Sequence, residues 1–463
     1  MLLSLPQKLI QSLQGVAGFD EENFIQAHEE KSATSIRFQP EKLAIFNQQV
    51  AMNQSPWPIE NPVPWCPHGY YLKERPSFTF DPLFHAGLYY VQEASSMFLY
   101  EILRQTINEN TAGKKVLDLC AAPGGKSTLL ASYFKDGLVV ANEVIKNRAN
   151  ILTENITKWG TGNVVVTNND PVHFQRLDSF FDVMVIDAPC SGSGLFRKDK
   201  EAITEWSEEA VNLCSARQQR IIADAYSCLQ QDGILIYSTC SYSKEEDEEL
   251  LDWMMDNFQL STVSIQLKGE WNTIETLSTK HKAFGYRFYP DKTKGEGFFT
   301  AAFIKKEGGY SYHSINQPLS VVSKKETEAW LPWLDKESAL SFIKQKDIFI
   351  AIPNVAHQYL PFLQKNLYIK QAGIAVGEIK GKDVIPHHAL AVSTVANSSL
   401  QFLDLTRDQA IQFLQKKEVN IEVSSLQKGW HLATYCGIHL GWLKVLPNRL
   451  NNYYPAEWRI LKN

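Results

Sequence analysis

Short apolar runs alternate with helical stretches between residues 115 and 305. The apolar runs predict strands at residues 115–119, 138–142, 163–167, 182–187, 233–238 and 298–304. Residues 146–158 and the segment after Gly125 have the spacing of helices. This alternation is typical of βαβ units with a mostly parallel sheet, and continuous Val, Ile and Leu runs indicate strands that are covered on both faces. We therefore expect an α/β fold.

The first 82 residues have a different pattern. Residues 1–30 show helical spacing, residues 35–38 resemble a short strand, and residues 51–82 are rich in prolines and aromatic residues, which predicts an irregular packed segment. Pro6 and Lys8 interrupt the first apolar stretch, and no small-residue cleavage site follows. We therefore expect a first helix of the mature protein there and no secretory signal.

The C-terminal third also departs from strand–helix alternation. Residues 306–326 are polar and rich in turn residues, which predicts a linker. We expect a helix over residues 327–346 and mixed structure over residues 347–385. The last segment of about 70 residues combines short apolar runs, turn glycines and aromatic residues, which favours a small β-barrel-like module.

Composition narrows the class of protein. The chain has 463 residues, of which 44% are apolar and 21% charged, which is ordinary for a globular protein of roughly three domains. No apolar run approaches the roughly 18 residues that a membrane span needs, so we expect a cytoplasmic protein that contacts no membrane. The net charge of −5 combines −10 over residues 1–309 with +5 over residues 310–463. A basic C-terminal part favours contact with a polyanion such as nucleic acid.

Seven cysteines are present and none forms a CxxC pair. We therefore expect no zinc ribbon and no bound metal. In a reducing compartment most of these cysteines are expected to be buried as small apolar residues.

A glycine-rich turn after the first predicted strand is the first candidate for ligand binding. Backbone N–H groups and a helix N-terminus form ligand sites in such turns. A P-loop requires a glycine at position 120, which is Cys120, and the dinucleotide pattern GxGxxG is also absent. The turn therefore indicates a ligand other than a nucleotide phosphate chain.

Acidic residues follow the next strands. Glu143 lies 18 residues beyond Gly125, where a carboxylate accepts hydrogen bonds from ribose hydroxyls, and Asp170 is placed to contact an adenine edge. A single such carboxylate is more often a solvated loop residue. Carboxylates at successive strand ends are better explained by a shared ligand. This set fits a nucleoside without a phosphate chain and predicts S-adenosylmethionine as cofactor.

Two cysteines follow the fourth and fifth strands. Cys190 comes after Asp187-Ala-Pro, and Cys240 comes after Ser238-Thr. Neighbouring strands lie about 4.8 Å apart, so both thiols and the Asp187 carboxylate are expected to face one pocket at the carboxyl edge of the sheet. For a single cysteine, burial in the core is the better interpretation, but a pair after two such strands favours chemistry.

Methylation of cytosine at C5 needs such a set. A thiolate that adds to C6 makes C5 nucleophilic, and sulfur is both a good nucleophile and a good leaving group. Asp187 is a candidate donor to N3 or a partner of the exocyclic amine, and a second thiol is a candidate for assisting elimination. From the residues alone, the nucleophile is either cysteine.

The motifs resemble the Sun/nucleolar-protein family of RNA cytosine-5 methyltransferases. The resemblance spans roughly residues 35–305 and rests on DLCAAPGGKS, NE after the second strand, DAPCSGSG, STCSYS, QEASSM and GEGFF. The C-terminal GIHLGWLK and NNYYPAEWRI resemble the PUA-type tail of the bacterial small-subunit (16S) ribosomal RNA methyltransferase F group, which the chain also resembles in order and length. The N-terminal region is shorter than this family leads us to expect.

The resemblance implies a role for each motif. Cys240 is the nucleophile and Cys190 the helper in product release, whereas DNA cytosine-5 methyltransferases use the cysteine after proline. Asp187 belongs to both the catalytic and the cofactor set. The implied cofactor residues are Cys120, Ala121, Ala122, Pro123, Gly124, Gly125, Lys126, Glu143, Asp170 and Asp187.

The resulting architecture is a Rossmann-like S-adenosylmethionine-dependent methyltransferase domain between two RNA-binding parts. We expect an N-terminal RNA-recognition lobe over residues 1–82, the methyltransferase domain over 83–307, an intermediate domain over 327–390 and a PUA-like module over 391–463. The predicted function is methylation of C5 of a cytosine in ribosomal RNA by a monomer. A tRNA cytosine-5 methyltransferase and a non-catalytic RNA-binding assembly factor are the alternatives.

Several further residues have less specific patterns. Arg197 and Lys198 are equally compatible with an RNA phosphate contact and with a solvated loop. The acidic run from Glu245 to Glu249 is interpreted as structural, as charge that favours a helix N-terminus. Trp442, Tyr453 and Tyr454 are compatible with base stacking and with the core of a small barrel.

Overall fold

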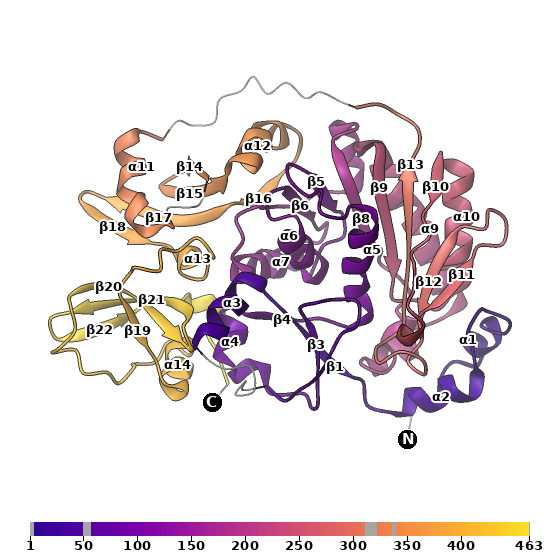
Figure 1. Ribbon diagram of the computed structural model, residues 1–463, viewed down its shortest axis with the longest axis horizontal. Helices are drawn as coiled ribbons and strands as arrows, with labels where there is room; N and C mark the ends of the chain where they lie inside the picture. Colours follow the sequence, from indigo (N-terminus) through magenta and orange to yellow (C-terminus); the bar gives the residue numbers. More distant parts are fainter. Residues whose placement is uncertain (1–3, 50–56, 311–321, 336–338, 463) are drawn as a thin grey trace.

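A ten-stranded mixed sheet runs through the middle of the molecule (Figure 1). The computed structural model describes residues 4–49, 57–310, 322–335 and 339–462. Five parallel strands form the centre of the sheet in the order β9-β8-β5-β6-β7. These strands are β5 (Lys115–Asp118), β6 (Leu138–Asn142), β7 (Val164–Thr167), β8 (Phe181–Asp187) and β9 (Leu229–Thr239). The strand order reverses at β5, and such a switch point opens a crevice at the carboxyl ends of the strands.

Antiparallel strands extend the sheet at both sides. On one side β13 pairs with β9, and β16 pairs with β7 on the other. The antiparallel strands are β10 (Leu260–Thr262), β11 (Ile274–Leu277), β12 (Phe284–Phe288), β13 (Phe298–Lys305) and β16 (Ile369–Ala372). Of these only β13 was expected. Strand β16 comes from beyond the predicted linker, so the C-terminal half of the chain adds an edge strand to the central sheet.

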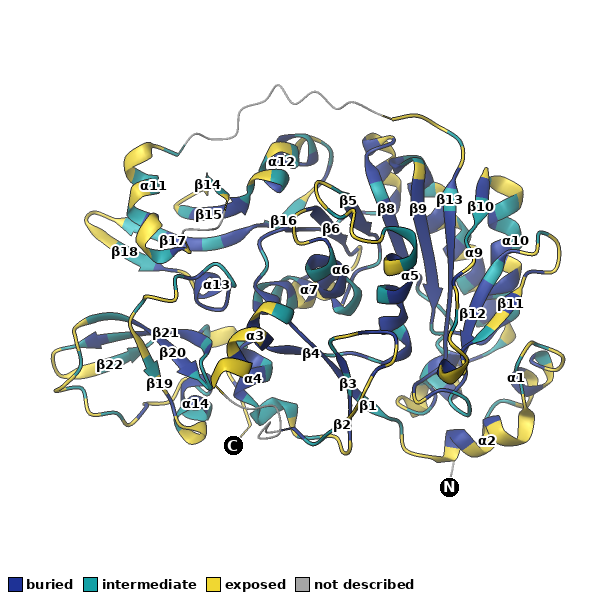
Figure 2. Ribbon diagram, in the orientation of Figure 1, coloured by how far each residue is buried: buried dark blue, intermediate teal, exposed yellow. Residues whose placement is uncertain are grey.

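Helices cover both faces of this sheet, as the apolar strands predict. Alternate residues of β6 belong to opposite hydrophobic clusters, Val140 to one and Val139 to the other. In Figure 2 the central strands are buried along most of their length. The covering helices are α5 (Leu99–Thr106), α6 (Gly125–Tyr133), α7 (Lys146–Trp159), α9 (Glu208–Ala225) and α10 (Glu248–Asn257), while the short α8 (Lys200–Glu205) packs with α1 and α2. The expected α/β fold is confirmed.

The N-terminal part combines helices with a small antiparallel sheet in the order β2-β3-β1-β4. Its elements are α1 (Gln7–Ser12), α2 (Glu21–Glu29), β1 (Thr34–Phe38), α3 (Pro40–Gln49), β2 (Ile59–Pro62), β3 (Gly69–Leu72), α4 (Pro82–His85) and β4 (Tyr89–Val91). Residues 57–82 were expected to be irregular, but they contain the β2–β3 pair. Residues 51–56 lie outside the described chain. Apolar residues of α1 and α2 pack against Phe196 and Tyr242, which belong to the loops after β8 and β9.

The segment after the predicted linker is mainly a second antiparallel sheet, β14-β15-β17-β18. Its elements are α11 (Lys324–Trp330), β14 (Leu340–Gln345), β15 (Ile348–Pro353), α12 (Asn354–Asn366), β17 (Ile374–Lys380), β18 (Asp383–Pro386) and α13 (His388–Ala391). The helix predicted over 327–346 is wrong beyond Trp330. Residues 340–353 instead form a hairpin, in which β14 pairs with β15. The turn between them contains Lys346 at φ 57°. Most of the predicted linker, residues 311–321, lies outside the described chain.

The last part of the chain forms a four-stranded sheet, β19-β20-β21-β22. Its elements are β19 (Phe402–Asp404), α14 (Arg407–Leu414), β20 (Gly429–Tyr435), β21 (Ile438–Leu446) and β22 (Arg449–Asn452). We expected a barrel-like module here. The strand pairings give one sheet with β19 and β22 at its two edges. Phe413 and Leu440 share one hydrophobic cluster with Phe38 of β1 and Phe46 of α3, so this last sheet packs against part of the N-terminal region (Figure 1).

Within the described residues, no helix has the length and apolar character needed to cross a membrane.

Candidate active site

The loop from Cys120 to Lys126 connects β5 to α6 at the switch point of the sheet. Gly124 precedes the helix with φ 117°, a left-handed conformation that glycine adopts without the penalty of a Cβ atom. The Ala121 N–H donates to the Asn142 carbonyl at 2.8 Å, which ties the loop to the end of β6. These features bring the first N–H groups of α6 to the carboxyl edge of the sheet.

The predicted carboxylates lie at successive strand ends along that edge. Glu143 follows β6, is 3% exposed, and accepts a hydrogen bond from the Ile145 N–H at 2.9 Å. Asp170 follows β7 and accepts from the Val172 N–H at 3.1 Å. Asp187 is the last residue of β8. The structure therefore places Glu143 and Asp187 next to the glycine loop and Asp170 one strand farther along the same edge.

Asp118, at the end of β5, was not predicted as a site residue. Its side chain is fully buried, and Oδ2 accepts from Ser127 Oγ at 2.6 Å. Oδ1 is buried without a hydrogen-bond partner among the described residues. Burial raises the pKa of Asp118 to about 7, and the nearby Asp187 contributes in the same direction.

Lys126 and Asp187 join the glycine loop to the end of β8. Lys126 Nζ lies 2.8 Å from Asp187 Oδ2, and the Lys126 side chain is only 10% exposed. Ser238 Oγ of β9 donates to Asp187 Oδ1 at 2.8 Å. Both oxygens of Asp187 therefore accept hydrogen bonds from groups that fix the carboxylate in place.

The structure brings the two cysteines into contact. Strands β8 and β9 pair in parallel with Asp187 opposite Ser238, so the residues that follow each strand leave the sheet side by side. Cys190 Sγ and Cys240 Sγ lie 2.9 Å apart, and both residues are free and partly exposed. The hydrogen bond with Cys240, together with burial, raises the pKa of Cys190 well above its ordinary value. The Cys190 thiol therefore tends to keep its proton, and either of the two sulfurs can donate in this contact.

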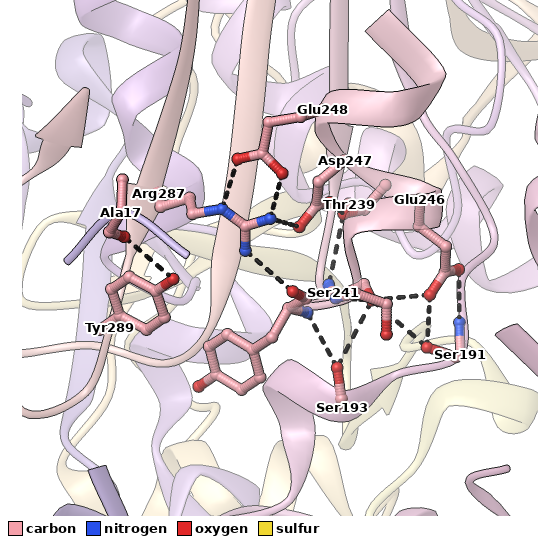
Figure 3. Close-up of polar contacts among 12 residues, drawn as sticks. Ala17, Ser191, Ser193, Thr239, Ser241, Glu246, Asp247, Glu248, Arg287 and Tyr289 are labelled. Atoms are coloured by element: carbon pink, nitrogen blue, oxygen red, sulfur yellow. Dashed lines mark hydrogen bonds and ion pairs between the residues drawn. The ribbon is translucent and has the colours of Figure 1, made fainter. Parts of the chain in front are cut away.

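Glu246 joins the loops that carry the two cysteines (Figure 3). It accepts from the Ser191 N–H at 2.9 Å, from Ser191 Oγ at 2.5 Å and from Ser241 Oγ at 2.6 Å. Glu246 is fully buried, whereas the sequence predicted only charge at a helix N-terminus. That interpretation is incomplete, because Glu248 and Glu249 begin α10 but Glu246 points into the site.

A buried ion-pair network lies behind the Cys240 loop (Figure 3). Arg287 of β12 contacts both oxygens of Glu248, at 2.6 and 2.5 Å, and lies 3.0 Å from Asp247 Oδ2. Its Nη1 donates to the Tyr242 carbonyl at 2.9 Å. Thr239, directly before Cys240, donates to Asp247 Oδ1 at 2.9 Å. No sequence pattern near Arg287 indicates this contact, because β12 was not predicted.

The less specific candidates divide between core and surface. Arg197 donates to the Lys31 carbonyl at 2.8 Å, and its side chain is 6% exposed, so it ties the Cys190 loop to the N-terminal part. Lys198 is exposed. Trp442 and Tyr454 are buried core residues, whereas Tyr453 is exposed. No group of three or more potential metal ligands occurs in the described part of the chain.

Three family models match successive parts of the chain. They are described as the N-terminal domain of 16S rRNA methyltransferase RsmF, over residues 5–94, as 16S rRNA methyltransferase RsmB/F, over residues 105–304, and as the methyltransferase RsmF PUA domain, over residues 401–460. Ribosomal RNA small subunit methyltransferase F of Psychromonas ingrahamii is 30% identical over 98% of this chain and 97% of its own length. The chain belongs to the family of 16S ribosomal RNA methyltransferases F. The relative of the same name from Aliivibrio fischeri is 30% identical over 94% of the chain and 93% of its own length.

Solved structures agree with this assignment. A methyltransferase homolog protein from Pyrococcus horikoshii has a TM-score of 0.52 and 28% identity, and the match covers 65% of this chain and 100% of that one. NSun6 from Pyrococcus horikoshii with SFG has a TM-score of 0.54 over 66% of this chain and 100% of that one, and its 18% identity supports the fold alone. The predicted family, Rossmann-like fold, PUA part and S-adenosylmethionine dependence are confirmed.

Proposed function

We propose that the protein transfers a methyl group to C5 of a cytosine in 16S ribosomal RNA, with Cys240 as the nucleophile. The observation that carries this proposal is the 2.9 Å contact between Cys240 and Cys190 at the carboxyl ends of adjacent strands. The family membership of the whole chain supports the RNA class, because the relatives are named small-subunit ribosomal RNA methyltransferases.

The residues at the strand ends fit an adenosyl cofactor. Glu143 suits the ribose hydroxyls and Asp170 the adenine edge, while the loop from Cys120 to Gly125 provides small residues and N–H groups. The buried Asp118 oxygen that lacks a protein partner suits the ammonium group of the methionine part. S-adenosylmethionine, when bound, supplies an electrophilic methyl group at this edge.

In the first step Cys240 Sγ, as thiolate, forms a bond to C6 of the cytosine. The electron pair of the C5=C6 bond becomes available at C5, where bound S-adenosylmethionine would supply the methyl group and would keep the electron pair of its broken S–CH₃ bond. Asp187 accepts from Lys126 and Ser238 and is held as an acceptor, so we assign to it the exocyclic amine of the base. The target base must leave its stack to reach Cys240.

In the second step a base removes the C5 proton, the C5=C6 bond reforms, and Cys240 leaves C6 with the bonding electron pair. The departing sulfur becomes negatively charged. The raised pKa of Cys190 keeps it protonated, so its thiol donates a hydrogen bond to that sulfur and stabilises the leaving thiolate. In this proposal Cys240 is therefore the nucleophile, as the family motifs imply, and Cys190 assists product release.

A basic groove continues from the cofactor edge onto the C-terminal half. Two adjoining pockets of about 540 and 350 Å³ lie among β14, β15, α12 and β16, and no acidic residue of the described chain lines them. Their lysines are Lys344, Lys346, Lys365 and Lys370. The exposed Tyr368 lines the same groove, and its N–H donates to Asn169, directly before Asp170, at 2.9 Å. Phosphates of the substrate RNA fit this groove, and Tyr368 offers a ring for stacking.

We further assign RNA recognition to the N-terminal lobe, residues 1–82, and to the PUA-like module, residues 391–463. Between them lie the methyltransferase domain, residues 83–307, and the intermediate domain, residues 327–390. The enzyme is expected to act in the cytoplasm as a monomer.

The test is to map 5-methylcytosine in cells with and without the protein, and in cells that carry Cys240→Ala. We expect one methylated cytosine of small-subunit ribosomal RNA to disappear in both deficient strains. Loss of a methyl group from tRNA would favour the tRNA alternative. Unchanged methylation of all RNA would favour the non-catalytic assembly factor.

A further inference from the structure

Glu246 accepts hydrogen bonds from three different residues around the two cysteine loops. Besides Ser191 and Ser241, Gln218 Nε2 of α9 donates to Glu246 Oε1 at 3.0 Å. Four hydrogen bonds therefore reach the carboxylate, from the Ser191 N–H, Ser191 Oγ, Ser241 Oγ and Gln218 Nε2. A carboxylate has about four acceptor positions, so the set is complete.

The partners of Glu246 are the immediate neighbours of the two cysteines. Ser191 follows Cys190 and Ser241 follows Cys240, and these two serines lie 50 residues apart in the chain. Gln218 also donates to the Pro189 carbonyl, on the other side of Cys190, at 3.1 Å. The Glu246 carbonyl is itself fixed by Tyr237 Oη at 2.7 Å. Glu246 is thus a rigid link between the two cysteine loops.

We propose that Glu246 is a positioning residue that holds Cys190 against Cys240 during product release. Its side chain is fully buried, so it acts through the serines beside each sulfur. The inference rests on the proposed function, because it concerns the step in which Cys240 leaves C6. If the link is lost, Cys190 no longer lies at hydrogen-bond distance from the leaving sulfur, and the RNA–enzyme adduct persists.

The experiment compares turnover with covalent adduct in the full-length protein. Purified variants are incubated with small-subunit ribosomal RNA and S-adenosylmethionine, and adduct is measured on denaturing gels beside methyl transfer. For Glu246→Ala we expect turnover to fall about tenfold, which corresponds to about 1.4 kcal/mol, while the fraction of enzyme in adduct rises. General destabilisation lowers turnover and adduct together, so the ratio of adduct to turnover separates positioning from folding.

Three further variants complete the test. Glu246→Gln keeps an oxygen for Ser191 N–H and Gln218, and its amide can donate to both serine hydroxyls, which rotate to accept. It should therefore recover most of the turnover that alanine loses. Ser191→Ala combined with Ser241→Ala removes the link from its other end and should also raise the ratio. Glu249→Gln, an exposed member of the same acidic run, should behave as the wild type.

Cys190→Ala serves as the reference for failed release. If Cys190→Ala accumulates adduct but neither Glu246→Ala nor the double serine variant raises the ratio of adduct to turnover, the positioning role is wrong and the proposed function stands. If neither the wild type nor Cys190→Ala ever forms adduct or methylated RNA, the proposed function itself fails.

Discussion

Replacement of Arg287 by alanine should loosen the support of the Cys240 loop. Arg287 is 1% exposed and is held between two carboxylates, Glu248 and Asp247. Removing one partner of a buried ion pair costs about 3–5 kcal/mol because the other charge is left uncompensated. Burial already raises the pKa of Asp247, so Asp247 can take up a proton when the cation is lost, which limits the cost. We therefore expect about 3 kcal/mol.

The assay is hydrogen exchange measured by mass spectrometry, because local opening is defined even where a chain of several domains does not unfold in two states. A cost of about 3 kcal/mol corresponds to exchange that is roughly 100-fold faster in the segments of β12 and of residues 239–247. Methyl transfer should fall as well, since Arg287 holds the Tyr242 carbonyl.

Arg104→Ala is the matched control for Arg287→Ala. Arg104 also pairs with a carboxylate, Glu101, at 2.6 Å, but the Arg104 side chain is 55% exposed. Glu101 is buried, but it keeps a hydrogen bond from Gln105 at 2.6 Å, and water can take the place of the exposed guanidinium, so exchange should change much less than for Arg287. If Arg287→Ala speeds exchange in β12 by no more than Arg104→Ala does in α5, the reasoning from burial is wrong.

Two further predictions concern ligand binding. The pKa of Asp118 is raised to about 7, so its carboxylate ionises as the pH rises through 7. Only the ionised form attracts the ammonium group of a ligand. Calorimetry should therefore show that S-adenosylhomocysteine binds more tightly at pH 8 than at pH 6. Asp118→Asn should remove this rise, and an unchanged pH dependence would exclude Asp118 as its source. Replacing Lys365 and Lys370 with alanine should weaken RNA binding and lower the slope of log Kd against log salt by about 2. The control is Lys135→Ala, which replaces an exposed lysine before β6 and should lower that slope by no more than about 1. If this variant lowers the slope as much as the double variant does, the groove does not bind the RNA.

The central strands were predictable because burial on both faces requires continuous apolar runs. Strands β5 to β9 are of this kind, and the helices between them predict their parallel pairing, whereas their order in the sheet comes from the structure. Strands β10, β11 and β16 were missed because they are three or four residues long and only partly buried. Edge strands of this length depend on the strand beside them more than on their own pattern.

In the candidate site, too, some features were predictable from the sequence and others were not. The meeting of Cys190 and Cys240 follows from two strand ends, which sequence patterns indicate. The role of Glu246 does not, because an acidic run before a helix is the ordinary signature of a helix start. Only the folded chain brings Ser191 to this carboxylate from 55 residues away. Contacts between loops that are far apart in the chain leave no local periodicity to read.

The central claim is that a single sulfur, at Cys240, bonds to the target cytosine. The most direct measurement is mass spectrometry of the cross-linked peptide after Cys190→Ala is incubated with small-subunit ribosomal RNA and S-adenosylmethionine. We predict a methylated cytidine attached to Cys240, and no attachment when Cys240 is replaced by alanine. A nucleotide attached to Cys190 in Cys240→Ala, or steady methyl transfer by that variant, would contradict the mechanism.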